Sequence, residues 1–200
     1  LIPPAMKLLL DSGEVRIDGF LCPGHVSTII GADAYQFIAD NYRIPCVVSG
    51  FEPLDILQSI DMLLEQVASG RAFVGLEYSR TVSREGNKVA QDLLYRVFEV
   101  ADADWRGIGT LPGSGLKLRH EYRRFDAEAA FDIDAGPTRE HPGCACGDIL
   151  RGVKTPAQCP LFSRVCTPEH PVGPCMVSSE GTCSTWFTYG GLRPDGWEVD

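Results

Sequence analysis

Long hydrophobic runs are missing from this chain of 200 residues. Its longest apolar stretches, such as residues 26–30 and 46–49, are far shorter than the roughly 20 residues that a helix needs to cross a bilayer. The first residues also lack the charged segment, apolar core and small-residue cleavage site of a secretory signal. We therefore predict that the chain does not span a membrane and that it is cytoplasmic.

Basic residues are scarce. The chain has 18 Lys and Arg against 27 Asp and Glu, a net charge of −9, and no basic run that could follow a phosphate backbone, which argues against nucleic-acid binding. It contains neither a Gly-x-Gly-x-x-Gly fingerprint nor a Walker A motif, so nucleotide binding has no support. The expected partners are proteins or small molecules.

Cysteine, by contrast, is abundant and concentrated near the end of the chain. Seven of the 14 prolines also lie there, between Pro137 and Pro174, so this tail is predicted to consist of loops and short turns. With no export signal in view, its thiols are better explained by metal binding or thiol chemistry than by a disulfide framework. Six of the eight cysteines belong to it: Cys144, Cys146, Cys159, Cys166, Cys175 and Cys183.

The spacing of the tail cysteines leaves several kinds of site open. Structural zinc sites usually contain two close Cys-x2–4-Cys pairs, and only Cys144-x-Cys146 comes near that pattern. Iron–sulfur clusters tolerate irregular spacing because each corner needs one thiolate. The spacing therefore favours a cluster over a zinc site, while free or disulfide-bonded thiols remain a third reading.

Before the tail, short apolar runs alternate with longer helical patterns, which is typical of a βαβ arrangement. The predicted fold is α/β: a parallel sheet flanked by helices, followed by a small, loop-rich, cysteine-rich domain. The α/β domain is placed at residues 17–135 and the cysteine-rich domain at 136–200. Strands are expected at 17–21 and 45–49, helices at 27–41, at 56–67 and at 84–100, and a strand or an extended link at 73–80.

Two strand-to-helix turns place polar side chains where open α/β sheets bind ligands. Cys22 and His25 follow the first strand, and Glu52 follows the second. A free-standing thiol or small-molecule enzyme at this edge is the weakest functional hypothesis. The simpler alternatives are a tight turn with Ser27 as a helix cap and a glutamate that complements a helix dipole.

Five segments of the chain together resemble the HypD family of [NiFe]-hydrogenase maturation proteins, and the resemblance covers nearly the whole chain. They are GFLCPGHVS at 19–27, VSGFEPLDIL at 48–57, CACGDIL at 144–150, CPLF at 159–162 and MVSSEGTC at 176–183.

The resemblance implies a ligand set. The family holds a [4Fe–4S] cluster with a Cys-x14-Cys-x6-Cys-x16-Cys pattern, which Cys144, Cys159, Cys166 and Cys183 match without a gap. Cys146 and Cys175 are then left without a ligand role. Glu180 matches the glutamate of the family's Ser-Ser-Glu-Gly motif and is implied to be a catalytic group that carries a proton or binds a partner beside the cluster.

The resemblance also implies a function. HypD-like proteins form a scaffold with the small chaperone HypC, on which the Fe(CN)2CO group of the hydrogenase is assembled with cyanide from the HypE and HypF pair. Their cluster is thought to supply electrons to a thiol redox relay. The alternative is a zinc-stapled interaction module without a redox role.

Two cysteine motifs of the family's N-terminal half are not found in this chain. These are the Gly-Thr-His motif with its cysteine and the Cys-Pro-Val-Cys pair. We therefore expect residues 1–16 to be the end of a first α/β domain and its crossing helix. The chain as given is then a fragment that binds a cluster but does not assemble the iron centre alone.

Overall fold

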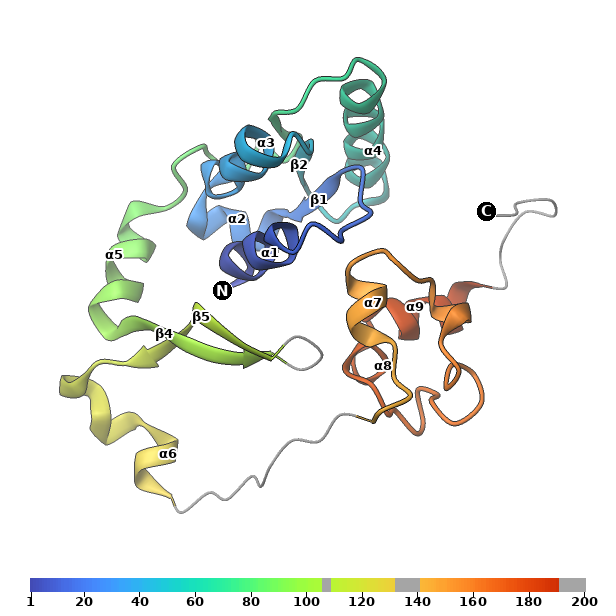
Figure 1. Ribbon diagram of the computed structural model, residues 1–200. Coiled ribbons are helices and arrows are strands. Elements are labelled where there is room, and N and C mark those ends of the chain that lie inside the picture. Colours follow the sequence, from blue (N-terminus) through green and yellow to red (C-terminus); the bar gives the residue numbers. More distant parts are fainter. Residues whose placement is uncertain (106–108, 132–140, 191–200) are drawn as a thin grey trace. The chain divides into compact units, whose positions relative to one another are not determined.

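The computed structural model describes residues 1–105, 109–131 and 141–190 (Figure 1). The chain divides into two compact units, which we call the sheet unit and the cysteine unit. The boundary predicted between residues 135 and 136 lies outside the described residues. The sheet unit comprises Leu1–Gly13, Ile17–Ala103 and Pro112–Asp132, and the cysteine unit comprises Glu14–Arg16, Asp104–Leu111 and Ile133–Asp200.

The sheet unit contains a parallel sheet of three short strands in the order β1, β2, β3. They span Phe20–Pro23, Cys46–Ser49 and Val74–Leu76, and the central strand pairs Cys46 with Phe20 on one side and with Val74 on the other. All four residues of β2 are buried, as expected for a parallel strand covered on both faces. The predicted parallel α/β fold is thereby confirmed for this part of the chain, and part of the undecided segment 73–80 is a strand.

The helix predicted at 27–41 is interrupted at Gly31, so that prediction was wrong in its continuity. Gly31 has φ 82° and ψ 163°, a backbone conformation that is essentially restricted to glycine. The segment therefore folds as three short helices. From the start of the chain to Val97, the helical elements are α1 (Ile2–Asp11), α2 (Gly24–Ile30), η1 (Ala32–Tyr35), α3 (Gln36–Tyr42), α4 (Pro53–Ala68) and α5 (Lys88–Val97).

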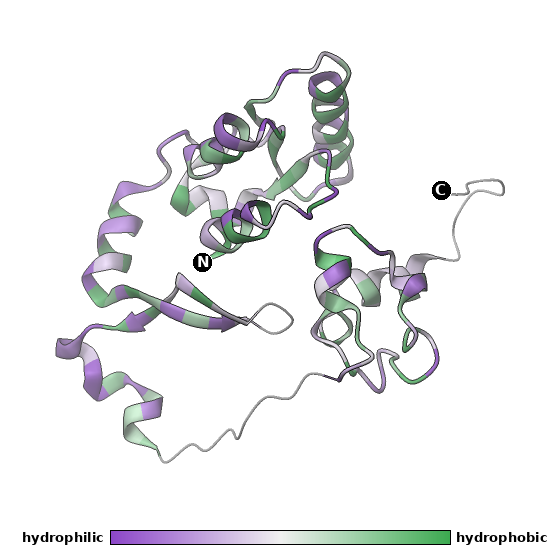
Figure 2. Cartoon of the chain, viewed as in Figure 1, coloured by the Kyte–Doolittle hydropathy of each residue, from purple (hydrophilic) through white to green (hydrophobic). Residues whose placement is uncertain are grey.

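Helix α4 follows β2 and packs against β1 and β2. Its helical period was predicted correctly, and Glu52 and Asp55 form a capping box at its start. An amphipathic helix usually turns its apolar face toward the core. Here the buried residues are Asp55, Ser59 and Gln66, whereas leucines of the opposite face are exposed. Figure 2 shows hydrophobic and hydrophilic positions alternating along α4.

The helix predicted at 84–100 ends earlier than expected, because residues from Phe98 onward are extended. Strand β4 (Phe98–Trp105) shows the alternating burial of a strand, and it pairs with β5 (Gly109–Leu118) in a separate two-stranded sheet. Two short helices follow, η2 (His120–Phe125) and α6 (Ala127–Ala130).

In the cysteine unit the described helices are short, as the proline content predicted. They are α7 (Cys146–Leu150), η3 (Pro156–Gln158), α8 (Pro174–Val177) and α9 (Thr182–Tyr189). Helices of this length do not hold together by backbone hydrogen bonds alone, so their packing depends on what lies between them.

Candidate metal centre

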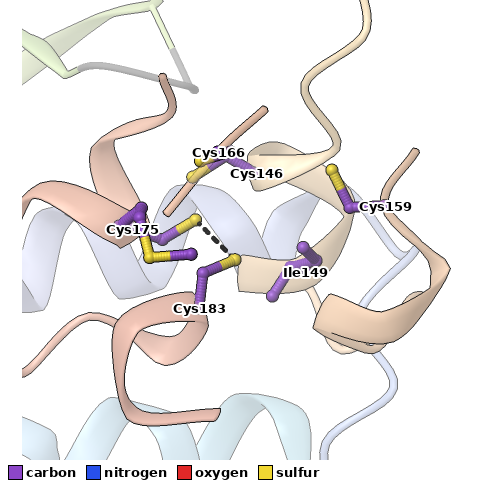
Figure 3. Close-up of a cluster of buried hydrophobic side chains, with 7 residues drawn as sticks. Cys146, Ile149, Cys159, Cys166, Cys175 and Cys183 are labelled. Carbon is purple, nitrogen blue, oxygen red and sulfur yellow. Dashed lines mark hydrogen bonds between the residues drawn. The ribbon is translucent and has the colours of Figure 1, made fainter. Parts of the chain in front are cut away.

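Cysteines form most of the interior of the cysteine unit (Figure 3). The half-buried Cys144 packs against the same interior. We call the six tail cysteines, Cys144 and the five buried ones, the cysteine group. Among the described residues, the buried members are Cys146, Cys159, Cys166, Cys175 and Cys183, together with Ile149 and Met176. Partly buried apolar side chains pack around them, namely Leu150, Leu161, Phe162 and Val172, so thiols make up most of the buried centre but not its surroundings.

Turns and caps bring these cysteines inward from four separate segments. Thr155 and Gln158 form a capping box around η3, which ends just before Cys159. Beyond it the chain reverses tightly: the Cys166 N–H donates to the Leu161 carbonyl at 2.9 Å, and Ser163 adopts a φ of 59°. Cys159 and Cys166 thus lie at the two ends of one compact turn.

Two glycines are required by the close approach of the chain to the cysteine group. A Cβ atom on Gly173 would lie 2.5 Å from Cys144 Sγ. A Cβ atom on Gly181 would lie within 3.1 Å of several backbone atoms of Cys175. Any side chain at either position would push a cysteine away, so these glycines set the positions of the thiols.

Several sulfur atoms accept hydrogen bonds. The Val172 N–H donates to Cys166 Sγ at 3.4 Å, and the backbone N–H of Cys146 donates to the Cys144 sulfur. The Cys175 thiol donates to Cys183 Sγ, with the two sulfurs 3.1 Å apart (Figure 3). Hydrogen bonds of this kind stabilise negative charge on sulfur and are a known means by which proteins tune iron–sulfur clusters.

Burial has the opposite effect on Cys144 and Cys183, the first and last of the four cysteines that the family resemblance implies as ligands. It raises the pKa of Cys144 and of Cys183, and the neighbouring thiols Cys146, Cys159 and Cys166 raise these pKa values further. A cation bound among these sulfurs would remove the penalty, because a coordinating thiol is deprotonated by the metal.

The thiols were tested against two kinds of metal group. Zinc with Zn–S bonds of about 2.3 Å in a tetrahedron requires sulfurs about 3.8 Å apart. Within residues 1–105, 109–131 and 141–190, no three Cys, His, Asp or Glu side chains form a group that could hold one metal ion. A [4Fe–4S] cluster takes one thiolate at each of four separated corners, and it is bound by cysteines. The cysteine group offers thiolates alone, a donor type that suits a cluster as well as a zinc ion.

A cavity of about 280 Å³ lies against the cysteine group. It is lined by Cys146, Cys175 and Glu180, together with Leu150, Pro174, Gly181 and Thr182. The exposed Glu180 thus shares a cavity with Cys146 and Cys175, the two cysteines for which the family resemblance implied no ligand role. Spacing could not reveal this, since Cys146 and Cys175 are brought together only by the tertiary structure.

The three predicted edge residues of the sheet unit lie in different surroundings. Cys22 is 1% exposed, and its thiol interacts with that of Cys46; this hydrogen bond and burial raise its pKa. His25 is exposed and lies beside Phe51, with ring centroids 5.1 Å apart. Glu52 is the N-cap residue of α4. Cys22 is therefore an interior thiol, and Glu52 has the structural role that was its simpler alternative.

One ion-pair group at this edge was not predicted. The Arg80 guanidinium lies 2.6 Å from Asp55, 3.7 Å from Glu52 and 3.8 Å from Glu77, and it stacks over the Tyr78 ring. The residues are 28 positions apart at most, so only the strand order could have indicated the group. The hydrogen bond that Arg80 donates to Asp55 holds the pKa of the Asp55 carboxyl below its ordinary value.

We expect Asp55 to make stability depend on pH. Since its pKa is lowered by folding, the Asp55 carboxylate stabilises the fold above the unfolded value of about 3.9, and this contribution is lost as the pH falls through the lower folded value. Asp55→Asn should therefore lower the Tm at pH 7 and lower it less below about pH 4. Asp61→Asn, on the exposed side of the same helix, is the control, and equal pH profiles for the two variants would contradict the assignment.

Comparison with known proteins shows the family of this chain. The family model described as "HypD: Hydrogenase formation hypA family" matches residues 1–190. The chain belongs to the HypD family. It is 50% identical over 200 residues to the hydrogenase maturation factor HypD2 of Bradyrhizobium diazoefficiens, covering 96% of this chain and 53% of that protein. The HypD of Cupriavidus necator is 49% identical, with the same coverage of both chains.

A third HypD relative, from Rhizobium leguminosarum bv. viciae, is 45% identical over 207 residues, covering 100% of this chain and 54% of the relative. The chain thus spans about half the length of these HypD relatives. The tail that matches includes the whole cysteine group, because the family model extends to residue 190. None of the helices described here is long and apolar enough to span a membrane.

Proposed function

We propose that this chain is the part of a hydrogenase maturation factor that binds a [4Fe–4S] cluster through Cys144, Cys159, Cys166 and Cys183. The observation that carries the proposal is the gathering of all six tail cysteines around one interior, five of them buried and Cys144 half-buried, in a chain of the HypD family. The four proposed ligands have the family's spacing, and Gly173 is packed against the first of them. Hydrogen bonds to the sulfurs of Cys144, Cys166 and Cys183 support the same assignment.

The proposed role is that of a scaffold. With a HypC-like chaperone, it would carry the Fe(CN)2CO group while that group is built, with the HypE and HypF pair as the cyanide donor. When bound, the cluster supplies electrons. Cys146, Cys175 and Glu180 line the cavity beside it, where the Glu180 carboxylate holds or releases a proton at a thiol. The Gly-Thr-His and Cys-Pro-Val-Cys motifs are not in this chain, so we propose that it binds the cluster by itself and that assembly of the iron centre needs those motifs as well.

Metal analysis of the anaerobically purified chain tests the proposal. Iron and acid-labile sulfide in equal amounts, about four of each per chain, are expected for a cubane cluster. The alternative function is a zinc-stapled interaction module, for which the Cys144-x-Cys146 pair is the supporting observation. Stoichiometric zinc without labile sulfide would support that module and would refute the cluster.

Cys175→Ala is expected to shift the reduction potential of the reconstituted chain to lower values while leaving its iron content unchanged. The substitution removes a hydrogen bond to Cys183 Sγ that stabilises negative charge on a proposed ligand. Redox titration followed by visible absorption measures the shift. Cys46→Ala, a buried cysteine of the sheet unit, is the control and should leave the potential unchanged. Loss of iron from Cys175→Ala would instead make Cys175 a ligand.

A further inference from the structure

Helix α4 presents an apolar surface to solvent. Along one side of it lie Leu57, Ile60, Leu64 and Val67, which we call the α4 stripe, and their exposed fractions are 64%, 39%, 61% and 45%. Phe51 and Leu54, exposed by 66% and 63%, extend this surface at the start of the helix. Exposed apolar residues scattered singly are ordinary, but a continuous row of them on one helix marks an interaction surface.

The helix cannot bury the stripe by rolling over, because its other side is fixed to the sheet unit by polar bonds. Arg80 donates to Asp55 at 2.6 Å, and the Phe73 N–H donates to the Gln66 side chain at 2.9 Å. Rotation of α4 toward the stripe would break both bonds and leave buried polar groups without partners.

Close packing fixes the same rotation. A Cβ atom on Gly19 would lie 2.9 Å from Leu63 Cδ1, and one on Gly75 would lie 3.1 Å from Met62 Cε. The two glycines thus leave just enough room for the residues of α4 that face them. The exposed stripe is a fixed property of the sheet unit and not a loosely packed helix.

The spacing of the stripe indicates the shape of its partner. Successive members are three, four and three residues apart, the pattern by which one helix packs against another. From the first to the last, the stripe is about 15 Å long, or nearly three helical turns. An amphipathic helix with its own apolar row matches this surface.

The charges beside the stripe indicate what flanks that apolar row. Asp61 and Glu65 are exposed along one edge of the stripe, Glu52 lies at the start of the helix, and no Lys or Arg occurs from Pro53 to Ala68. We propose that the α4 stripe is a docking site for a partner protein that offers an apolar helix flanked by lysine or arginine.

A second copy of this chain fits the surface poorly. Two α4 helices packed stripe to stripe would bring two acidic edges together without a basic residue from either helix, and each whole chain carries a net charge of −9. Like charges placed opposite one another oppose association and select against such a pair.

Two synthetic helical peptides of about five turns test the proposal. They share one leucine row, and its flanks are lysine in one peptide and glutamate in the other. The lysine peptide is expected to bind the chain, and the glutamate peptide to bind at least about tenfold more weakly. Leu57→Gln/Leu64→Gln should weaken binding of the lysine peptide by about tenfold or more, since glutamine keeps the helix and removes the apolar contact.

Val89→Gln/Leu93→Gln is the matched control, because both residues are exposed on α5, by 70% and 51%. Its affinity should equal that of the wild type. The proposal is overturned if neither peptide binds, if both bind equally, or if the stripe and control variants lose affinity alike. It is also overturned if sedimentation equilibrium shows a wild-type dimer that the stripe variant does not form.

The other candidate to cover the stripe is a further part of the same polypeptide. The melting temperature of a longer polypeptide distinguishes this case from docking of a partner protein. In the longest polypeptide that the coding sequence specifies, the stripe variant should melt within about 4 °C of the wild type, and a larger loss would overturn the proposal. The inference does not depend on the proposed cluster. Peptide binding is expected to be the same with and without reconstituted iron, so the two proposals can fail separately.

Discussion

Cys159→Ala and Cys183→Ala are each expected to reduce the iron and acid-labile sulfide of the anaerobically reconstituted chain from about four of each to a small fraction. Each substitution removes one of the four thiolates that we propose as cluster ligands. The vacated position lies in the interior of the cysteine unit, where Cys159 and Cys183 are 8% and 5% exposed, so water replaces the lost thiolate poorly. Iron and sulfide assays, with the visible absorption of the cluster, measure the effect.

The chain supplies its own control for this experiment. Cys146→Ala removes an equally buried thiol of the same cysteine group, 3% exposed, and is expected to keep the iron and sulfide near wild-type amounts. The ligand assignment is wrong if Cys159→Ala and Cys183→Ala load as much iron as the wild type. It is also wrong if Cys146→Ala loses as much as they do.

Loss of the cluster should also weaken the cysteine unit. Metal binding is coupled to folding wherever the ligands form the interior of a small unit. Here the buried residues other than cysteine in that interior are Ile149 and Met176. Hydrogen exchange in α7 and α9 is therefore expected to be faster in Cys159→Ala than in Cys146→Ala.

The parts of the fold that were predictable from sequence are those fixed by local patterns. The apolar run of β2 and the helical period of α4 each specify their own element, and the structure contains both. The break at Gly31 was not predictable, because it depends on a contact with a segment more than 50 residues away. The orientation of α4 was not predictable either, since its rotation is set by Arg80 and Phe73, which lie outside the helix.

The candidate site likewise combines features that the sequence indicated with features that depend on tertiary structure. The number and clustering of the tail cysteines indicated a thiolate site, and the structure buries them together. Spacing does not show which sulfurs touch. Two features arise from the packing of α7, α8 and α9. One is the hydrogen bond from Cys175 to Cys183, and the other is the cavity shared by Cys146, Cys175 and Glu180. Sequence thus pointed to the chemistry, and tertiary structure arranges the groups around it.

At Gly31 the backbone at the end of α2 lies directly against the backbone of the loop that precedes α5. The position of Gly31 is matched by Gly86, and the two glycines pack against each other's backbone. Hydrogen bonds tie the segments together on either side: Ala32 N–H to the Ser83 carbonyl, Asp33 N–H to Arg84, and Asn87 N–H to Ile29, at 3.2, 3.1 and 3.0 Å. A side chain at Gly31 would push the two segments apart and lengthen these hydrogen bonds.

Gly31→Ala is therefore expected to destabilise the sheet unit by more than about 4 kcal/mol, which lowers the Tm by roughly 10 °C or more. A Cβ atom there would lie 2.6 Å from Glu85 C and Gly86 N, and the backbone conformation of Gly31 is strained for alanine in any case. Urea unfolding gives the free energy, and hydrogen exchange of the β2 amides assigns the loss to the sheet unit.

Gly70→Ala measures the cost of a left-handed backbone where a Cβ atom meets no crowding. Gly70 also has a positive φ, 64°, but a Cβ atom there would meet nothing within 4 Å. Alanine at Gly70 should therefore cost only the strain of a left-handed backbone, about 1 kcal/mol. Equal losses for the two variants would mean that the Gly31–Gly86 contact contributes nothing and that backbone strain alone explains both. A loss several times larger at Gly31 would show that its glycine-only conformation and its contact with Gly86 together hold α2 and the loop before α5 in place.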